Sequence, residues 1–167
     1  MANTTGKKIK DIAIIGGCAS LIYLTIGDIS YRLSLSRGGL NSKLITDMVA
    51  KSAAKKPKNE YKEKLDSMID DGADWFMHQD TEKIIIEKKH RLSLYADLIR
   101  PDKPSNVYII CIHGYTSSPA NMGIYAKKYH ELGYNVLLPS LRGHGDSEQD
   151  FITMGWNDRL DVIEWIN

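Results

Sequence analysis

The feature that most constrains the fold is an alternation of apolar runs and glycine-containing loops over residues 107–147. The run VYIICI at 107–112 is continuous and rich in β-branched residues, which is typical of a strand buried on both faces of a parallel sheet. A loop, a segment of helical periodicity ending at Gly133 and a second apolar run at 136–138 follow. This order predicts a right-handed crossover between parallel strands. The loops that follow the two apolar runs then lie at the carboxyl ends of the strands, where parallel sheets bind ligands.

The segments on either side of this first strand extend the predicted sheet. Ile84–Ile86 and the alternating residues Leu92–Leu98 predict an antiparallel hairpin with its turn at 88–90. Ser118 and Pro119 are expected to begin the crossover helix, as N-cap and first helical residue. The apolar face of that helix is predicted to comprise Met122, Tyr125, Ala126, Tyr129 and Leu132. The fold class is therefore α/β.

Two motifs in the loops carry a family resemblance. The first is His113-Gly114-Tyr115, and the second is Arg142-Gly143-His144-Gly145 with Ser147. Together they resemble the front half of an α/β-hydrolase, especially membrane-anchored bacterial serine hydrolases of the serine aminopeptidase and lysophospholipase-like group. The resemblance covers residues 81–167. It implies a hydrolase that acts on an ester, thioester or amide carbonyl, without a metal or cofactor, in a small-molecule, peptide or lipid substrate.

The resemblance also assigns roles to residues of the two loops. The backbone N–H of Tyr115 is expected to contribute to the oxyanion hole, where losing one donor costs about 3 kcal/mol. Gly114 permits the turn that exposes this amide. The supporting residues of the two loops are expected to be His113, Gly114, Arg142, Gly143, His144 and Gly145.

The chain departs from the family pattern in three respects. Relatives usually carry Asp at the position of Ser140 and Gly at the position of Gln149. More seriously, the sequence has no Gly-x-Ser-x-Gly elbow for a nucleophile, and the run from Gly145 to Gln149 matches only its beginning. Ser147 is therefore not expected to be the nucleophile. The Ser-Asp-His triad is missing, so the chain is interpreted as the inactive N-terminal part of a truncated hydrolase.

The histidines, serines and glycines allow other interpretations. His113 and His144 are either general bases or, as we favour, residues that fix turns through hydrogen bonds. Ser117 and Ser118 are expected to cap the helix rather than attack a carbonyl. The sequence lacks the third glycine and the acidic residue that dinucleotide binding through Gly143-x-Gly145 would require. The remaining histidines are expected to lie at the surface; they are His78, His90 and His130.

The N-terminus has the pattern of a membrane anchor. A polar basic tail (residues 1–11) precedes a predicted anchor or signal-like helix (residues 12–31). Its uncharged part covers about 24 Å, somewhat less than the ~30 Å hydrocarbon core. A buried core helix and a lipoprotein signal ending at Cys18 are the alternatives. The upstream lysines favour an extracytoplasmic hydrolase domain.

Residues 32–80 are predicted to form a connecting region of two helices separated by Pro57. Their apolar faces contain Leu44, Ile45, Met48 and Val49, and then Tyr61, Leu65, Met68, Ile69 and Phe76. The lysine-rich first helix is either a solvated surface or a contact with anionic headgroups. Trp75 and Phe76 are expected to pack on the following domain. A last helix, capped by Asn157, is predicted to present Trp156, Leu160, Ile163 and Asn167 on one face.

Composition excludes several classes of function. With 22 basic and 21 acidic side chains the net charge is +1, which does not fit nucleic-acid binding. Cys18 and Cys111 lie in unlike segments and do not indicate a disulfide framework or a zinc site. Two functions remain: the front part of a membrane-anchored serine hydrolase, and a non-catalytic, membrane-tethered interaction module that uses a partial hydrolase scaffold.

Overall fold

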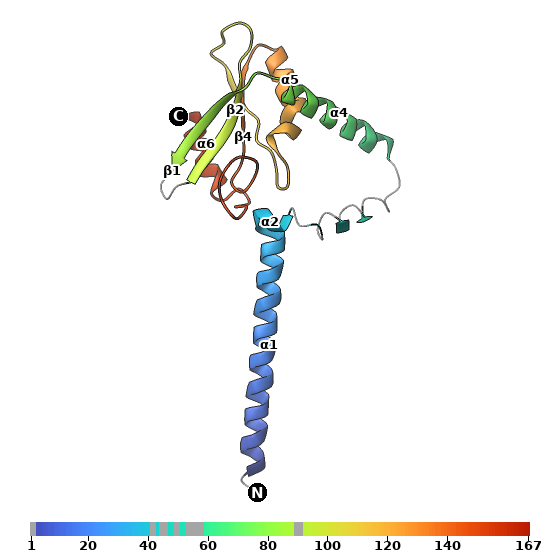
Figure 1. The fold of residues 1–167 in the computed structure, drawn as a ribbon, viewed down its shortest axis with the longest axis vertical. Helices are drawn as coiled ribbons and strands as arrows, with labels where there is room; N and C mark the ends of the chain where they lie inside the picture. The colour runs from blue at the N-terminus through green and yellow to red at the C-terminus, as the bar shows by residue number, and fades with distance from the viewer. Residues whose placement is uncertain (1–2, 41–42, 44–46, 49–50, 53–58, 89–91) are drawn as a thin grey trace.

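The computed structural model describes residues 3–40, 43, 47–48, 51–52, 59–88 and 92–167. Within these ranges the chain forms a mixed sheet with helices on both faces, and a long N-terminal helix projects from it (Figure 1). The elements are α1 (Asn3–Leu35), α2 (Arg37–Leu40), α4 (Glu60–Met77), β1 (Glu82–Lys88), β2 (Leu92–Ile99), β3 (Tyr108–Ile110), the 3-10 helix η1 (Pro119–Met122), α5 (Gly123–Glu131), β4 (Asn135–Pro139) and α6 (Asp158–Ile166).

The sheet has the strand order β1-β2-β4-β3. β1 and β2 pair antiparallel with Ile84 opposite Ala96, so the predicted hairpin is confirmed. β3 and β4 pair in parallel with Ile109 opposite Val136, and η1 and α5 form the connection between them. The predicted strand, helix, strand unit is therefore confirmed, and its two loops leave the carboxyl ends of neighbouring strands. β2 joins the hairpin to this unit by pairing antiparallel with β4.

The first strand of this unit is less buried than its sequence predicts. β3 has only three residues and lies at the edge of the sheet, since β4 is the one strand that pairs with it in the described part of the chain. Val107, Tyr108 and Ile112 are exposed, with Tyr108 at 57%. The run has the composition of a strand buried on both faces, but its place at the edge of the sheet leaves it exposed. A continuous apolar run reports the composition of a strand, whereas burial also requires neighbours on both sides.

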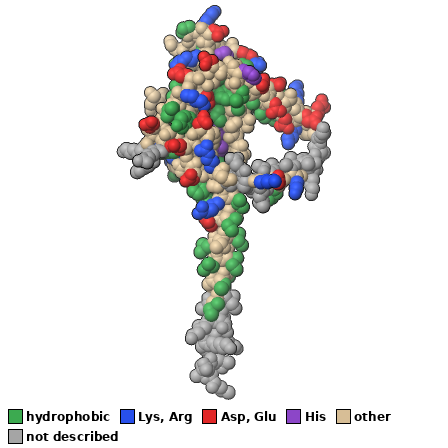
Figure 2. All heavy atoms as spheres, viewed as in Figure 1, with side chains coloured by type: hydrophobic (Ala, Val, Ile, Leu, Met, Phe, Trp, Pro, Cys, Tyr) green, Lys and Arg blue, Asp and Glu red, His purple; other side chains and the backbone are tan. Residues whose placement is uncertain are grey.

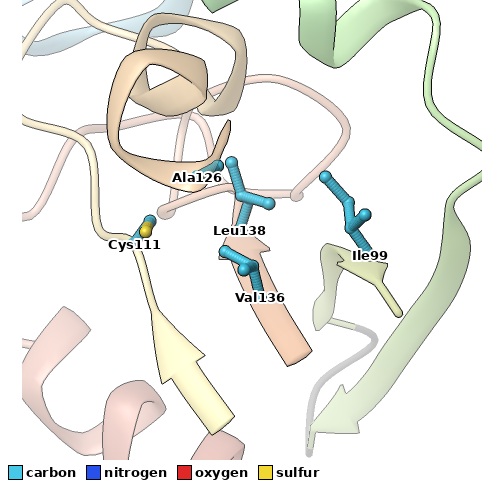
Figure 3. Packing of buried hydrophobic residues seen from close by; sticks show 5 residues of the cluster. All are labelled: Ile99, Cys111, Ala126, Val136 and Leu138. Carbon is cyan, nitrogen blue, oxygen red and sulfur yellow. The ribbon is translucent and has the colours of Figure 1, made fainter. Parts of the chain in front are cut away.

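Two clusters of apolar side chains cover the two faces of the sheet. On one face the buried residues are Ile99, Cys111, Ala126, Val136 and Leu138, and Trp75 and Phe76 of α4 pack against them. Figure 3 shows Val136 and Leu138 on the side of β4 that faces Ala126 of α5. On the opposite face, Trp165 of α6 packs against Ala96, Leu98 and Leu137. The prediction that Trp75 and Phe76 pack on the α/β module is confirmed.

The helix α4 lies against η1 and α5 with backbone close to backbone. A Cβ atom added to Gly72 would lie 2.3 Å from the amide nitrogen of Ile124, and one added to Gly123 would lie 2.0 Å from the carbonyl oxygen of Gly72. These two positions therefore accept no side chain without separating the helices. Neither glycine belongs to a recognisable motif, so the sequence did not indicate this close approach.

The crossover helix begins differently from its prediction. Pro119 opens the 3-10 turn η1, and the side chain of Ser118 makes no capping hydrogen bond. The predicted apolar face is only partly buried, because Ala126 is fully buried whereas Tyr125 and Leu132 are exposed.

The helix α6 reverses the predicted pattern of burial. Asn157 makes no side-chain capping bond, and Trp156, Leu160 and Ile163 of the predicted apolar face are exposed. The residues of α6 that are buried are Asp158 and Asp161. Hydrogen bonds and ion pairs to the rest of the module, described below, compensate the cost of burying these carboxylates.

α1 is helical across the predicted anchor, residues 12–31. The side chains described between residues 14 and 31 are exposed, including Leu21, Ile22 and Leu24, and Figure 2 shows hydrophobic side chains along this part of the helix. In the part of the chain that was searched, which is the described residues, no helix is both long enough and apolar enough to cross a membrane. The structure thus confirms the helix and gives no support for a transmembrane span.

Much of the predicted connecting region lies outside the described residues, including Leu44, Ile45, Val49 and Pro57, as does His90 of the hairpin turn. The second predicted helix is α4, which begins at an Asn59 cap whose side chain accepts the Tyr61 N–H at 2.9 Å. Tyr61, Leu65 and Met68 of its predicted apolar face are exposed, so only the C-terminal part of that face is covered.

Candidate active site

A pocket of about 430 Å³ lies at the carboxyl ends of β3 and β4. Three segments line it: the first loop (residues 113–117), the second loop (residues 141–147), and the chain from Ile152 into α6. Its lining residues are Ile112, His113, Gly114, Tyr115, Leu141, His144, Ile152, Met154, Gly155, Asp158, Arg159 and Val162. The structure therefore brings His113, Gly114, Tyr115 and His144 of the predicted site together around one cavity.

The first loop is a tight turn that displays a backbone amide. Ser117 N–H donates to the carbonyl oxygen of Gly114 at 3.2 Å, which closes a turn over Tyr115 and Thr116. Thr116 has φ 57°, a left-handed conformation that a type II turn requires at this position and that normally favours glycine. Among the hydrogen bonds of the described residues, none uses the Tyr115 N–H as donor. The loop thus leaves the amide of a residue that lines the pocket without an acceptor among the described residues.

His113 supports the first loop from below and is almost fully buried. Its Nδ1 donates to the carbonyl oxygen of Gly114 at 2.9 Å, and its Nε2 accepts the Leu141 N–H at 3.1 Å. This pairing fixes the neutral tautomer with the proton on Nδ1. Burial lowers the pKa of His113 below its usual value. Because both ring nitrogens are occupied, His113 is a structural link between the two loops and not a general base in this arrangement.

The imidazole of His144 is hydrogen-bonded through only one of its two nitrogens among the described residues. Its Nδ1 donates to the carbonyl oxygen of Arg142 at 3.0 Å, and its ring lies edge-on to that of His113 with centroids 4.9 Å apart. His144 Nε2 and Asp158 Oδ1 are buried atoms without a hydrogen-bond partner among the described residues. The other oxygen of Asp158 accepts from Thr153 Oγ1 at 2.7 Å and from the Gly155 N–H at 2.8 Å. These bonds hold the turn of residues 153–155, and hence Met154, at the pocket wall.

The second loop is held by an ion cluster beneath it. Arg142 donates two hydrogen bonds to Asp161 of α6, at 2.7 and 2.8 Å, and Lys88 of β1 pairs with the same carboxylate and with Glu164. The hydrogen bonds of Asp161 raise the pKa of Arg142, although burial acts against this. The Asp161 carboxylate is nearly inaccessible, at 4% exposure. Arg142 thus joins the second loop to α6 and β1 and does not line the pocket.

Gly143 and Gly145 are required by the path of the second loop. Both have positive φ, at 72° and 50°. A Cβ on Gly145 would lie 2.6 Å from the hydroxyl of Ser140, and one on Gly143 would lie 3.2 Å from Ile152. Ser140, where relatives usually carry Asp, therefore packs directly against this turn. Gln149, where the family resemblance predicts Gly, has φ 128°, a backbone conformation that favours glycine.

Ser147 is a structural residue. Its hydroxyl is fully buried, donates to the carbonyl oxygen of Ser140 at 2.6 Å and accepts the Tyr95 N–H at 2.9 Å. A nucleophilic serine must be accessible and activated by a base, whereas both functions of this hydroxyl are already used. In the first loop, Ser117 Oγ accepts from the Asn121 side chain at 3.2 Å, so it too is committed to local structure.

Several residues at the pocket were not indicated by the sequence. Ile152, Met154, Asp158 and Arg159 come from the segment that leads into α6, and Arg159 lies over the ring of Trp156 at 4.1 Å. The end of α1 also reaches the two loops, since Tyr115 Oη donates to the carbonyl oxygen of Ser34 at 2.5 Å. No sequence signal links residues 34 and 115, because such long-range contacts leave no periodicity in the chain.

Comparisons with known proteins point to one class of enzyme. A thermostable monoacylglycerol lipase from Bacillus sp. (strain H-257) is 34% identical over 58 residues, which are 35% of this chain and 23% of the lipase. The chain therefore matches about a quarter of the length of this curated relative. It is similar to lipase and esterase hydrolases, and its α/β sheet is consistent with an α/β-hydrolase-like fold. No family model matches the chain.

Solved structures of an esterase from Pyrococcus furiosus also resemble the chain. One crystal form is 28% identical and covers 55% of this chain and 37% of the esterase, with a TM-score of 0.47. A second form gives the same identity and TM-score over 38% of the esterase chain. A third is 25% identical over 35% of that chain, with a TM-score of 0.44.

Proposed function

We propose that this chain supplies the oxyanion loop and part of the substrate pocket of a serine hydrolase that acts on an ester, thioester or amide carbonyl. The observation that carries the proposal is the Tyr115 N–H, which has no acceptor among the described residues and belongs to a strained turn after β3 that lines an apolar pocket. A fixed amide in such a site stabilises the negative charge that develops on a carbonyl oxygen. The similarity to a monoacylglycerol lipase supports an ester as the substrate.

The proposal does not give this chain a nucleophile. The 167 residues contain no Gly-x-Ser-x-Gly sequence, and the hydroxyl of Ser147 and both nitrogens of His113 are engaged in structural bonds. Hydrolysis of a generic ester by this chain alone is therefore expected to stay at the background rate, with no change in Ser147→Ala. Turnover above background that is lost in Ser147→Ala would contradict this part of the proposal.

Binding of a carboxylate tests the oxyanion loop directly. Decanoate combines an apolar chain with an oxygen charge that resembles the oxyanion, and its dissociation constant can be measured by calorimetry or NMR. Tyr115→Ala keeps the backbone N–H, whereas Tyr115→Pro removes it and suits the second position of a type II turn. We expect decanoate to bind Tyr115→Pro roughly 10-fold more weakly than Tyr115→Ala, as one charge-assisted hydrogen bond is lost. Equal affinities of the two variants would contradict a role for this amide.

A non-catalytic, membrane-tethered interaction module is the second candidate. The exposed apolar side chains along α1, such as Leu21, Ile22 and Leu24, favour it. For this candidate we propose that α1 associates with a membrane and that the α/β module lies outside the cytoplasm. No described helix meets the requirements of a membrane span. Full solubility of the chain in buffer without detergent would count against the tether. An unmodified pocket that binds no decanoate would favour the module over the hydrolase.

A further inference from the structure

The C-terminal end of α1 is connected to the first loop of the pocket and to Ile152, which follows the second loop. The last carbonyl groups of a helix have no partner within the helix and must find one elsewhere. Here the carbonyl oxygen of Ser34 accepts the phenol of Tyr115 at 2.5 Å, and that of Leu35 accepts the Ile152 N–H at 2.8 Å. Tyr115 and Ile152 both line the pocket. Two consecutive carbonyl groups at the helix end are therefore satisfied by two residues of the pocket wall.

Arg37 adds a charged link to the same region. Its guanidinium donates to the carbonyl oxygens of Ser147, at 3.0 Å, and Gly145, and its backbone N–H donates to Asp150 at 2.9 Å. Hydrogen bonds from a charged donor are stronger than neutral ones, and a planar guanidinium holds two acceptors in a fixed geometry. Arg37 thus clamps the end of the second loop and the segment that follows it.

An aromatic contact completes this junction. The ring of Tyr31 lies 5.3 Å from that of Phe151, and Ser36 forms an isolated β-bridge with Phe151. Residues 31–37, called here the α1 junction, therefore contact the first loop, the second loop and the segment 150–152 that follows it. The rest of α1 projects away from the module (Figure 1), so the described junction is where this helix reaches the loops.

We propose that the α1 junction is a positioning element of the active site, which holds the Tyr115 amide and Ile152 in place through Ser34, Leu35 and Arg37. This inference rests on the proposed function, since it assigns a role in positioning to the same amide. Its consequence is that a displacement of α1 changes the affinity of the pocket for an oxyanion, so that whatever binds α1 is coupled to the site. Arg37 and Ser34 act through the loops and do not touch the substrate.

The test compares Arg37→Ala with Arg32→Ala in the complete 167-residue chain. Arg32 lies one turn earlier, near the end of α1, and pairs with exposed Asp28, so its removal causes the same loss of charge without touching the loops. The first measurement is hydrogen exchange of the Ile152 amide, with the amide of buried Leu138 as a reference for global stability. We expect exchange at Ile152 to rise about 10-fold in Arg37→Ala with Leu138 unchanged, and neither to change in Arg32→Ala.

The second measurement distinguishes positioning from a general loss of structure. Decanoate requires the amide, whereas decan-1-ol fills the apolar part of the pocket without an oxyanion. Arg37→Ala should weaken decanoate binding about 5-fold and leave decanol binding unchanged, and Arg37→Lys should restore part of the affinity. Equal behaviour of Arg37→Ala and Arg32→Ala, or an equal loss of both ligands, would overturn the proposal. If the unmodified chain binds no decanoate, the proposed function fails, and exchange at Ile152 still decides whether the junction holds the loop.

Discussion

The two loops at the pocket differ in how many side-chain hydrogen bonds hold them. In the second loop, the buried side chains of His144 and Ser147 bind backbone carbonyl groups, and the Arg142 side chain binds the Asp161 carboxylate of α6. The first loop has one internal turn bond, a strained Thr116 and an unpaired amide at Tyr115. Each loop also has a polar group without a hydrogen-bond partner among the described residues, the Tyr115 N–H in the first and His144 Nε2 in the second. The second loop is the more heavily braced by side chains, which fits the supporting role proposed for it and the oxyanion role proposed for the first.

The largest expected effect is the loss of the ion cluster beneath the second loop. Asp161→Asn leaves Arg142 and Lys88 without their shared buried partner, which should reduce the free energy of unfolding by about 4 kcal/mol. Chemical denaturation measures this loss. The control is Asp146→Asn, because Asp146 pairs with Lys83 at the surface and should contribute at most about 0.5 kcal/mol. Similar losses in the two variants would mean that the cluster does not brace the loop.

The same cluster predicts a dependence on pH. Burial raises the pKa of Asp161, but the hydrogen bonds from Arg142 and Lys88 outweigh it, so the pKa lies below its usual value. A carboxylate with a lowered pKa stabilises the folded state above its ordinary pKa of about 3.9, and this stabilisation is lost as the pH falls through the lowered value. The difference in stability between the unmodified chain and Asp161→Asn should therefore shrink in that acidic range. A difference that is constant down to pH 2 would contradict this assignment.

The second largest effect concerns the buried hydroxyl of Ser147. Ser147→Ala leaves the Ser140 carbonyl and the Tyr95 N–H without their partner, which should cost about 2 kcal/mol. Ser118→Ala is the matched control, because that hydroxyl makes no capping bond, and we expect little change. Thermal unfolding of the two variants gives the comparison. If Ser147→Ala unfolds at the temperature of the control, then the interior of the second loop is more hydrated than the structure implies.

Local patterns predicted the framework of the molecule well. The strand, helix, strand unit and the hairpin were read correctly because their periodicity and turn residues are properties of short segments. The same patterns identified Tyr115 and His144, which lie at the pocket, because both follow strands of a parallel pair. Placement at the carboxyl ends of strands is a consequence of topology, and topology follows from the order of elements.

The remaining features depend on contacts between distant segments. The apolar face predicted for α6 is exposed, and Asp161 is buried because Arg142 and Lys88 meet there from elsewhere in the chain. The same holds for the contact of Tyr115 with Ser34. From the sequence alone, a charged residue on a helix is predicted to be exposed unless its ion-pair partner is known. A local sequence pattern does not identify that partner. The sequence therefore predicted which loops lie at the pocket and not what holds them.

The smallest effect tests the strain in the first loop. Thr116 has φ 57°, a conformation that costs a residue with a Cβ about 1–2 kcal/mol relative to glycine. Thr116→Gly removes that cost but adds freedom to the unfolded chain, so a net stabilisation of about 1 kcal/mol is expected from chemical denaturation. Thr116→Ala keeps a Cβ and should bring no gain, which separates backbone strain from loss of the Thr side chain. A stabilisation in both variants would place the cause in the side chain, and a stabilisation in neither would mean that the turn is relaxed. The strain lies next to the unpaired Tyr115 amide. A gain confined to glycine would therefore show that the first loop holds its donor in place at the expense of stability. In the second loop, by contrast, the bonds that fix the backbone also stabilise the fold.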